Sequence, residues 1–409
     1  MNVTEQKISG RMLFRLKAFR HYWTARVTSS GAYQMQVVAT GWSMYELTGN
    51  PFDLGLVGLA QFLPKILLTL WAGAIADRLD RRRIAMVCTF VQLITCGVLA
   101  WGSGQGWLSR EAIFGLIAII GAARAFEMPS IQSMLPNIVD AESFPRALAM
   151  STAATQIAII GGPALAGLVF LWGVTWVYVV AACLFVIACS MMFLMPPLPP
   201  RVSGRSSESL WAGLQFIATK PVILGAVSLD LFAVLLGGAT AMLPIFAKDI
   251  LRVGPAGLGL LQASPAIGAL AMTWYLSRYP LQRRVGRTLF ISVAIFGLGT
   301  ILFALSTSFW FSLTMLVTLG AADCISVVIR QSLVQLETPD DMRGRVSAVN
   351  SVFIGASNQL GEFESGTAAA IFGTVPSVVA GGIGTLLIVA LWFKLFPTLA
   401  SRDQLASQK

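Results

Sequence analysis

Long apolar blocks alternate with short polar segments along the whole chain. Each block holds roughly the 20 residues that an α-helix needs to cross the hydrocarbon core of a bilayer. Turn-forming runs such as TGNP (48–51) and SGQG (103–106) mark the edges of the blocks. The pattern predicts an all-α polytopic membrane protein with twelve transmembrane helices, at residues 23–47, 54–76, 84–103, 112–135, 146–171, 174–195, 222–247, 255–277, 288–306, 309–334, 346–372 and 376–396.

Composition supports the membrane class. The chain of 409 residues is 56% hydrophobic and 12% charged, and its mean hydropathy is +0.74. A soluble domain carries about 25% charged residues, which cover its water-facing surface. The net charge is +10, but the basic residues are spread over the gaps between apolar blocks and form no single patch. We therefore expect the lipid bilayer as a partner and no nucleic acid.

The distribution of basic residues predicts the orientation in the membrane. An even number of spans places both termini on the same side. If that side is the cytoplasm, most of the 29 Lys and Arg residues fall in cytoplasmic segments, including the run at 81–83. Cytoplasmic loops of membrane proteins carry an excess of positive residues. The sequence therefore predicts cytoplasmic N- and C-termini.

The longest polar connection divides the blocks into six and six. It spans residues 196–220 and is rich in Pro and Ser at its start. Its residues 210–216 are predicted to form a short amphipathic helix on the inner surface. The predicted domains are an N-terminal six-helix bundle (1–195), a cytoplasmic linker with this amphipathic segment (196–220) and a C-terminal six-helix bundle (221–409).

The two halves show a weak internal repeat. QFLP (61–64) matches QASP (262–265), and QSM (132–134) matches QSL (331–333) at nearly the same offset. Because each half has an even number of spans, the halves are expected to be parallel repeats about an axis along the membrane normal. In membrane transporters that are built from such repeats, the substrate binds between the repeats, near the middle of the bilayer.

The residues that most enzymes and metal sites need are scarce. The chain has one histidine, His21, and its five cysteines lie inside apolar blocks without metal-ligand spacing. The sequence also lacks the phosphate-binding loop GxxxxGK[ST]. We therefore expect no enzyme activity, no metal and no organic cofactor.

The loop between the second and third spans reads GAIADRLDRRR (73–83). It resembles the signature loop of the major facilitator superfamily, with Asp80 in place of the second glycine. The matching residues are Gly73, Asp77, Arg78, Arg81 and Arg82. The resemblance implies that Asp77 faces the positive N-terminal end of the eleventh helix, near Arg345, and holds a cytoplasmic gate shut. The alternative is a loop that is basic for topology alone.

Other segments resemble exporters within this superfamily. GGPALAG (161–167) is similar to the Gly-Pro motif of its antiporters, through Gly162, Pro163 and Gly167. Such small residues also serve plain helix packing. Residues 41–49, 338–346 and 355–366 resemble the branch that includes the enterobactin exporter and macrolide-efflux relatives. This resemblance implies the bacterial cytoplasmic (inner) membrane and export of a small molecule.

Charged residues inside spans are costly and usually mark function. In the first half, Lys65 lies near the middle of its span, and Arg124 and Glu127 are three residues apart and able to pair on one helix face. The predicted substrate-cavity residues are Lys65, Arg124, Glu127, Gln34, Gln61 and Asn358. We expect this half to hold an anionic or polar part of the substrate.

Carboxylates dominate the spans of the second half. The proton-coupling candidates are Asp230, Glu362, Asp323 and Glu364. Asp323 is predicted to pair with Arg330, two helical turns away. Asp230 has no basic neighbour on its own helix, and Glu362 follows Asn358 on one polar face. Asp230 and Glu362 are therefore the preferred proton carriers, with hydrogen bonding between helices as the alternative role.

The predicted function is proton-coupled export, by antiport, of a small amphipathic molecule such as a siderophore or drug. A monomer that binds its substrate and protons is expected. Two alternatives remain open: a proton-coupled uptake symporter, and a sensor or scaffold relative that transports nothing. The direction of transport follows from the coupling cycle, which the sequence does not display.

Overall fold

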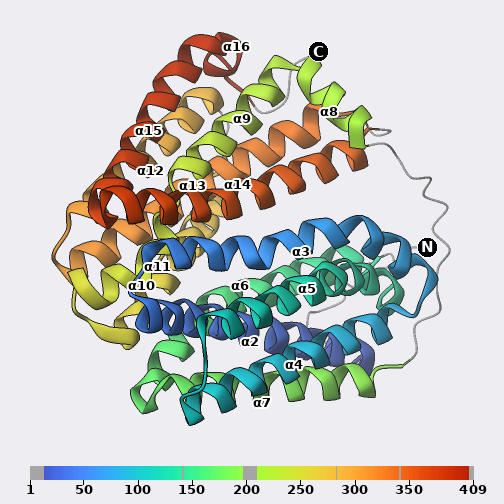
Figure 1. Ribbon diagram of the computed structural model, residues 1–409. Coiled ribbons are helices and arrows are strands. Elements are labelled where there is room, and N and C mark those ends of the chain that lie inside the picture. The colour runs from blue at the N-terminus through green and yellow to red at the C-terminus, as the bar shows by residue number, and fades with distance from the viewer. Residues whose placement is uncertain (1–12, 141, 197–209, 282, 340–341, 405–409) are drawn as a thin grey trace, which may run out of the picture. The chain divides into compact units, whose positions relative to one another are not determined.

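The computed structural model describes residues 13–140, 142–196, 210–281, 283–339 and 342–404, with the backbone alone for 69–78, 210 and 348. Every regular element in these ranges is a helix (Figure 1). The helices of the first half are α2 (Lys17–Thr48), α3 (Pro51–Arg78), α4 (Arg81–Gln105), α5 (Arg110–Ile138), α6 (Phe144–Val169), η1 (Phe170–Trp172) and α7 (Val174–Leu194).

The chain after residue 209 begins with the short helix α8, which covers the segment 210–216; its place on an inner membrane surface stays a prediction. The elements of the second half are α8 (Leu210–Thr219), α9 (Pro221–Leu236), η2 (Ala239–Met242), α10 (Leu243–Ile245), η3 (Phe246–Ile250), α11 (Gly254–Arg278), α12 (Val285–Leu305), α13 (Phe309–Glu337), α14 (Arg343–Phe372), α15 (Thr374–Leu395) and α16 (Pro397–Ala400). Along α8, the glycine Gly213 allows a close approach to α14, since a Cβ there would lie 2.8 Å from the carbonyl oxygen of Arg345. Ile217 is buried with Val346 and Val349 of α14.

Eleven of the twelve predicted spans are found as continuous α-helices over most of their length; the seventh is interrupted. In the described part of the chain, 10 segments are long and apolar enough to cross a membrane. The helices α2 and α14 are longer still, with 32 and 30 residues, but they carry more polar residues. These are the helices of Gln34, Asn358 and Glu362.

The predicted seventh span, 222–247, differs from a single continuous helix. It consists of α9, η2, α10 and η3, and the break follows Leu236. Glycines at 237 and 238 explain the position, because glycine is a poor helix former. Gly238 also lies against α14, where a Cβ would be 2.5 Å from the Ser365 hydroxyl oxygen and 2.6 Å from the Gly361 carbonyl oxygen.

The turns predicted from glycine lie at helix ends. Gly49 follows α2 with φ of +60°, and Gly106 follows α4 with φ of +71°. Both are in the left-handed region that favours glycine at a helix C-terminus. The side chain of Asn50 then accepts a hydrogen bond from the backbone N–H of Phe52 at 3.0 Å in the first turn of α3.

The chain folds into two compact units. The first comprises Met1–Ser43 with Ala60–Gly204, and the second comprises Met44–Leu59 with Arg205–Lys409. The hairpin Met44–Leu59 belongs to the second unit because it packs on α14: a Cβ on Gly366 would lie 2.7 Å from the Gly55 Cα atom. The predicted division at 1–195, 196–220 and 221–409 stays a prediction.

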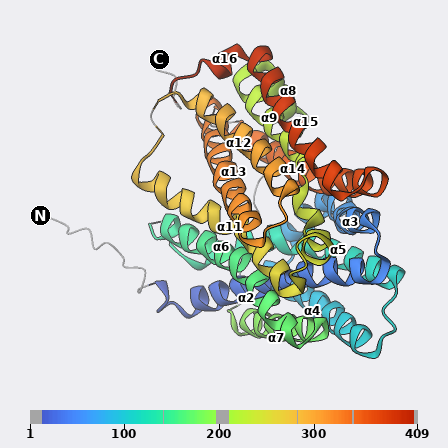
Figure 2. The same ribbon diagram turned by 90° about the vertical axis from the view of Figure 1, so that its left-hand side faces the viewer.

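The two units repeat one packing pattern. In the first, α4 packs against α5 and α7; in the second, α12 packs against α13 and α15 (Figures 1 and 2). The close helix contacts also correspond. Gly121 of α5 lies against the backbone carbonyl of Gln61, and Gly320 of α13 lies against that of Pro265. These contacts fall on the segments 61–64 and 262–265, whose match in sequence predicted the repeat.

Candidate functional site

A buried carboxylate with a full set of partners lies in the first unit. Glu127 of α5 is fully buried. Its Oε1 accepts hydrogen bonds from the hydroxyls of Ser29 at 2.6 Å and Thr89 at 3.4 Å. Its Oε2 accepts one from Gln92 Nε2 at 2.8 Å and lies 3.3 Å from Arg124 Nη1. The predicted pairing of Arg124 with Glu127 is confirmed.

Two basic side chains lie on one side of this cluster. The Arg124 guanidinium lies over the Tyr33 ring, 3.8 Å from its centroid, in a cation–π contact. Lys65 of α3 has an exposed side chain and lies within electrostatic range of Arg124.

The other candidate cavity residues of the first unit lie at helix contacts. Gln34 and Gln61 are half-buried. The Cβ of Gln34 packs on Gly162 of α6, where a Cβ would lie only 2.6 Å away. Pro163 and Gly167 are buried on the same helix. The Gly-Pro motif therefore packs α6 against α2, and its link to antiport stays a prediction.

A pocket in the second unit brings three of the candidate residues together. It has a volume of about 180 Å³, and Asp323 of α13 lines it together with Asn358 and Glu362 of α14. Asp323 also lines a smaller adjoining hollow, which it shares with Asp230, Ser292 and Ser326. The remaining walls of the larger pocket are Val234, Gly237, Gly238, Ala239, Thr240, Pro265, Phe296, Thr300, Leu316, Leu319 and Gly320.

The predicted ion pair between Asp323 and Arg330 is wrong. Arg330 Nη1 instead lies 2.9 Å from Asp230 Oδ2, and both side chains are buried. The reason is that α9 carries Asp230 against α13, so a carboxylate from another helix reaches the guanidinium. Asp230 therefore has a basic partner, which its own helix did not reveal. Arg330 Nε is buried without a hydrogen-bond partner in the described part of the chain.

Asp323 and Glu362 differ from the other deep carboxylates. Within the residues that the structure describes, neither carboxylate takes part in a hydrogen bond or an ion pair at contact distance. Gly58 of the α2–α3 hairpin packs directly on Glu362, so that a Cβ there would meet the carboxylate oxygen Oε2 and lie 3.3 Å from the Glu362 Cβ. Glu364 is exposed and lies outside this pocket; its nearest polar contact is the Ser365 hydroxyl at 3.4 Å.

The gate motif is described in part. The side chains of Gly73, Asp77 and Arg78 lie outside the described residues, so the gate stays a prediction. Arg81 donates from Nη1 to the Ser133 carbonyl at 3.1 Å, and Arg82 Nη1 donates to the carbonyl of Met195. The basic run therefore also ties the start of α4 to the ends of α5 and α7.

Several polar partners were missed from the sequence. Ser29, Thr89 and Gln92 complete the shell around Glu127. A single polar residue inside an apolar span, such as Gln92, was the available signal. In the second unit, Tyr45 at the end of α2 donates a hydrogen bond to Asp249, and Lys248 lies over the Tyr45 ring at 5.4 Å.

Comparison with known proteins gives both sequence and fold relatives. The pattern of the family described as transmembrane secretion effectors matches residues 8–409. The enterobactin exporter EntS of Shigella dysenteriae serotype 1 (strain Sd197) is 24% identical over 385 residues, which cover 91% of this chain and 90% of the exporter. The enterobactin exporter EntS of Escherichia coli O1:K1 / APEC gives the same identity and coverage.

Two solved structures share the fold. One is a bacterial homologue of the human lysosomal transporter Spinster, inward-facing and unoccupied, with a TM-score of 0.74 and 14% identity over 94% of this chain and 98% of that chain. The other is a mutant of the nucleoside transporter NupG, with a TM-score of 0.71 and 17% identity over 93% of this chain and all (100%) of that chain. At such identities the likeness concerns the fold alone.

Proposed function

Because the chain belongs to the transmembrane secretion effector family of the major facilitator superfamily, we propose that this multi-pass membrane transporter exports a small amphipathic molecule in exchange for protons. The observation that carries the proposal is the pocket shared by Asp323 and Glu362. A proton carrier needs a carboxylate whose protonated and ionised forms both fit its site. Glu127 forms an ion pair with Arg124, and Asp230 forms one with Arg330. Asp323 and Glu362 form no such pair in the described part of the chain.

Glu362 is the first proton carrier in this proposal. Its carboxylate has no compensating cation at contact distance, so its ionised form is costly while the site is closed. Uptake of a proton neutralises it, and exposure to water on the other side of the membrane favours its release. Asp230, preferred from the sequence, becomes the less suitable carrier, since Arg330 neutralises it at 2.9 Å.

Asp323 links the two acidic hollows. It lines the pocket of Glu362 and also the hollow that contains Asp230. The guanidinium of Arg330 keeps one N–H group, Nε, without a partner in the described part of the chain. We assign Arg330 the role of a shared cation, which holds Asp230 throughout and stabilises the ionised form of Asp323 after its proton has left.

The first unit supports a substrate class. Arg124 lies over the Tyr33 ring, and Lys65 lies within electrostatic range of Arg124; basic groups beside an aromatic ring favour a molecule with both an anionic or polar part and an aromatic or apolar part. The sequence relatives are named as exporters of enterobactin, and this supports a siderophore-like compound. Uptake by symport is the second candidate, and export is preferred because the family is described by secretion.

The proposed location is the bacterial inner membrane with both termini in the cytoplasm. The concentration of basic residues on that side supports the orientation. A monomer is the proposed working unit, because each acidic pocket is complete within one chain.

Transport into inverted membrane vesicles tests the function. A panel of siderophores and lipophilic drugs is offered with and without an imposed proton gradient. Uptake into wild-type vesicles should require the gradient, and Glu362→Gln should reduce it to background. Glu364→Gln is the matched control, because this neighbouring carboxylate is exposed and outside the pocket. If gradient-driven transport persists in Glu362→Gln, Glu362 is not the proton carrier. If transport does not depend on the gradient, it is not coupled to protons.

A further inference from the structure

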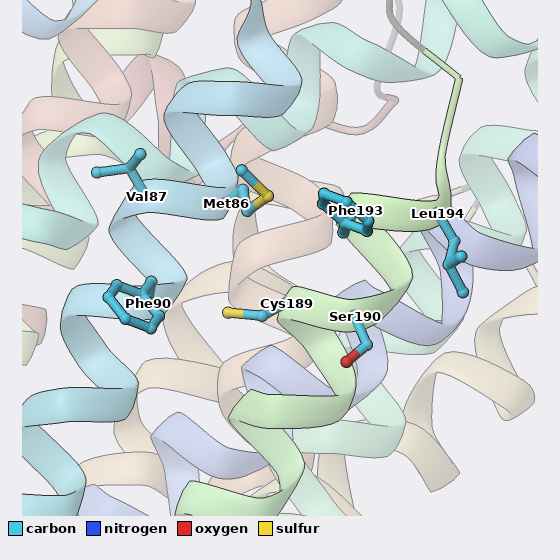
Figure 3. A pocket seen from close by; sticks show the side chains of 7 residues that line it. All are labelled: Met86, Val87, Phe90, Cys189, Ser190, Phe193 and Leu194. Atoms are coloured by element: carbon cyan, nitrogen blue, oxygen red, sulfur yellow. The ribbon is translucent and has the colours of Figure 1, made fainter.

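A hollow on the surface of the first unit lies between the helices α4 and α7. Figure 3 shows its lining side chains: Met86, Val87 and Phe90 from α4 face Cys189, Ser190, Phe193 and Leu194 from α7. Its volume is about 480 Å³. Phe90 and Phe193 are more than half exposed at its edges. Ser190, its most polar member, donates its hydroxyl hydrogen to the Val186 carbonyl at 2.8 Å, so the surface offered to an occupant is apolar.

Two arginines lie one helical turn before the α4 residues that line this hollow: Arg82 precedes Met86, and Arg83 precedes Val87, by four residues. Arg83 precedes Val87 and Phe90 by four and seven residues on α4, so the three share one helix face. The side chain of Arg83 is 77% exposed, and its contact with Asp80 is long, at 3.7 Å. An exposed pair of this kind binds weakly and leaves the guanidinium available to another anion.

The second arginine marks the junction of the two helices. Arg82 Nη1 donates to the carbonyl of Met195, the residue after Leu194 at the end of α7. Its Nε is buried and has no hydrogen-bond partner among the described residues. The exposed guanidinium of Arg83 therefore lies beside Arg82 at the start of α4, and the apolar walls extend from there along α4 and α7.

We infer that this hollow binds an anionic phospholipid, whose acyl chain lies between Phe90 and Phe193 and whose phosphate contacts Arg82 and Arg83. The combination of an apolar groove with cations at one end matches a lipid with a negative headgroup. Basic sites at the ends of transmembrane helices bind such headgroups through charge and hydrogen bonds.

Native mass spectrometry of the full chain in detergent tests the inference. The protein is titrated with phosphatidylglycerol and, separately, with phosphatidylcholine of the same acyl chains. We expect the first phosphatidylglycerol to bind more tightly than phosphatidylcholine. Arg83→Gln should weaken phosphatidylglycerol about fivefold, the effect of roughly one basic residue at a membrane surface, and leave phosphatidylcholine unchanged. Arg283→Gln, an exposed arginine of the second unit, is the control and should change neither.

A groove-filling variant separates the acyl-chain contact from the headgroup contact. Ser190→Phe places a ring in the hollow and should weaken both lipids. Equal affinities for the two lipids, or no effect of Arg83→Gln, would overturn the inference. The inference would also be overturned if Arg83→Gln lost phosphatidylglycerol binding while Ser190→Phe kept full binding, because the hollow would then play no part in binding the lipid. A protein dimer that Ser190→Phe dissociates, with lipid binding unchanged, would assign the hollow to a second copy.

Discussion

The two units each bury acidic side chains among membrane helices, but they treat them differently. In the first unit, Glu127 is contacted by Ser29, Thr89, Gln92 and Arg124. In the second, Asp323 and Glu362 line a pocket of about 180 Å³ and form no hydrogen bond or ion pair in the described part of the chain. Glu127 is fully buried, whereas Asp323 and Glu362 are half-buried. The clearer difference lies in the partners that neighbouring helices supply.

The difference has a physical basis in the cost of a buried charge. A carboxylate that accepts several hydrogen bonds and faces a guanidinium is stabilised in its ionised form. Losing the charge would leave Arg124 without its anion. Glu362 has no such penalty, because no described group in contact with it requires a negative charge. The Glu127 cluster of the first unit and the Arg330–Asp230 pair of the second are thus suited to keeping their charges, whereas Asp323 and Glu362 are suited to changing theirs.

The largest expected effect on stability comes from breaking the saturated cluster. Glu127→Ala leaves Arg124 as an uncompensated charge and three polar neighbours without their acceptor. Breaking a buried ion pair from one side costs about 3–5 kcal/mol, so thermal unfolding in detergent should occur at a much lower temperature. Glu362→Gln, which removes no partner, should unfold close to the wild-type temperature. Equal destabilisation by both variants would erase the distinction between the two units.

A comparable loss of stability is expected within the second unit. Arg330→Met should destabilise the protein because Asp230 remains buried without its cation at 2.9 Å. Adding Asp230→Asn should restore part of the loss, with a coupling energy of about 0.5–3 kcal/mol. The matched double variant combines Arg330→Met with Asp323→Asn, and it should recover less if Arg330 is paired with Asp230 as observed. Better recovery with Asp323→Asn would favour the pairing predicted from the sequence.

The smallest effect is expected where the α2–α3 hairpin packs on Glu362. Gly58→Ala introduces a Cβ against the Glu362 carboxylate and should shift that side chain, at a cost of about 1–3 kcal/mol for overpacking. Gradient-driven transport should fall without being lost. Gly97→Ala is the control, since a Cβ at that position meets nothing within 4 Å. If Gly58→Ala transports as well as the wild type, the packing of the hairpin on Glu362 does not influence the proton site.

Local signals in the sequence predicted local features well. The turns at Gly49 and Gly106 were predicted from their residue types, and the pair of Arg124 and Glu127 followed from their spacing of three residues on one helix. Each of these depends on residues that are close in the chain. The spans agree for the same reason, since their length and apolar character are properties of single segments.

Contacts between distant segments could not be predicted in this way. Arg330 pairs with Asp230, from a helix a hundred residues earlier in the chain, whereas the spacing along its own helix pointed to Asp323 instead. The hairpin Met44–Leu59 clusters with the second unit although it belongs to the first two spans. The break after Leu236 had a visible signal in Gly237 and Gly238, although a continuous span was predicted there.

Infrared difference spectroscopy of the carboxyl groups tests the central claim without knowledge of the substrate. Spectra of the reconstituted protein at acidic and alkaline pH are compared for the wild type, Glu362→Gln and Glu127→Gln. We predict a protonated-carboxyl band in the wild type. Glu362→Gln should remove or halve this band, with any remainder contributed by Asp323. Glu127→Gln should leave the band intact. A band that disappears in Glu127→Gln and persists in Glu362→Gln would contradict this assignment, because the proton would then reside in the saturated cluster.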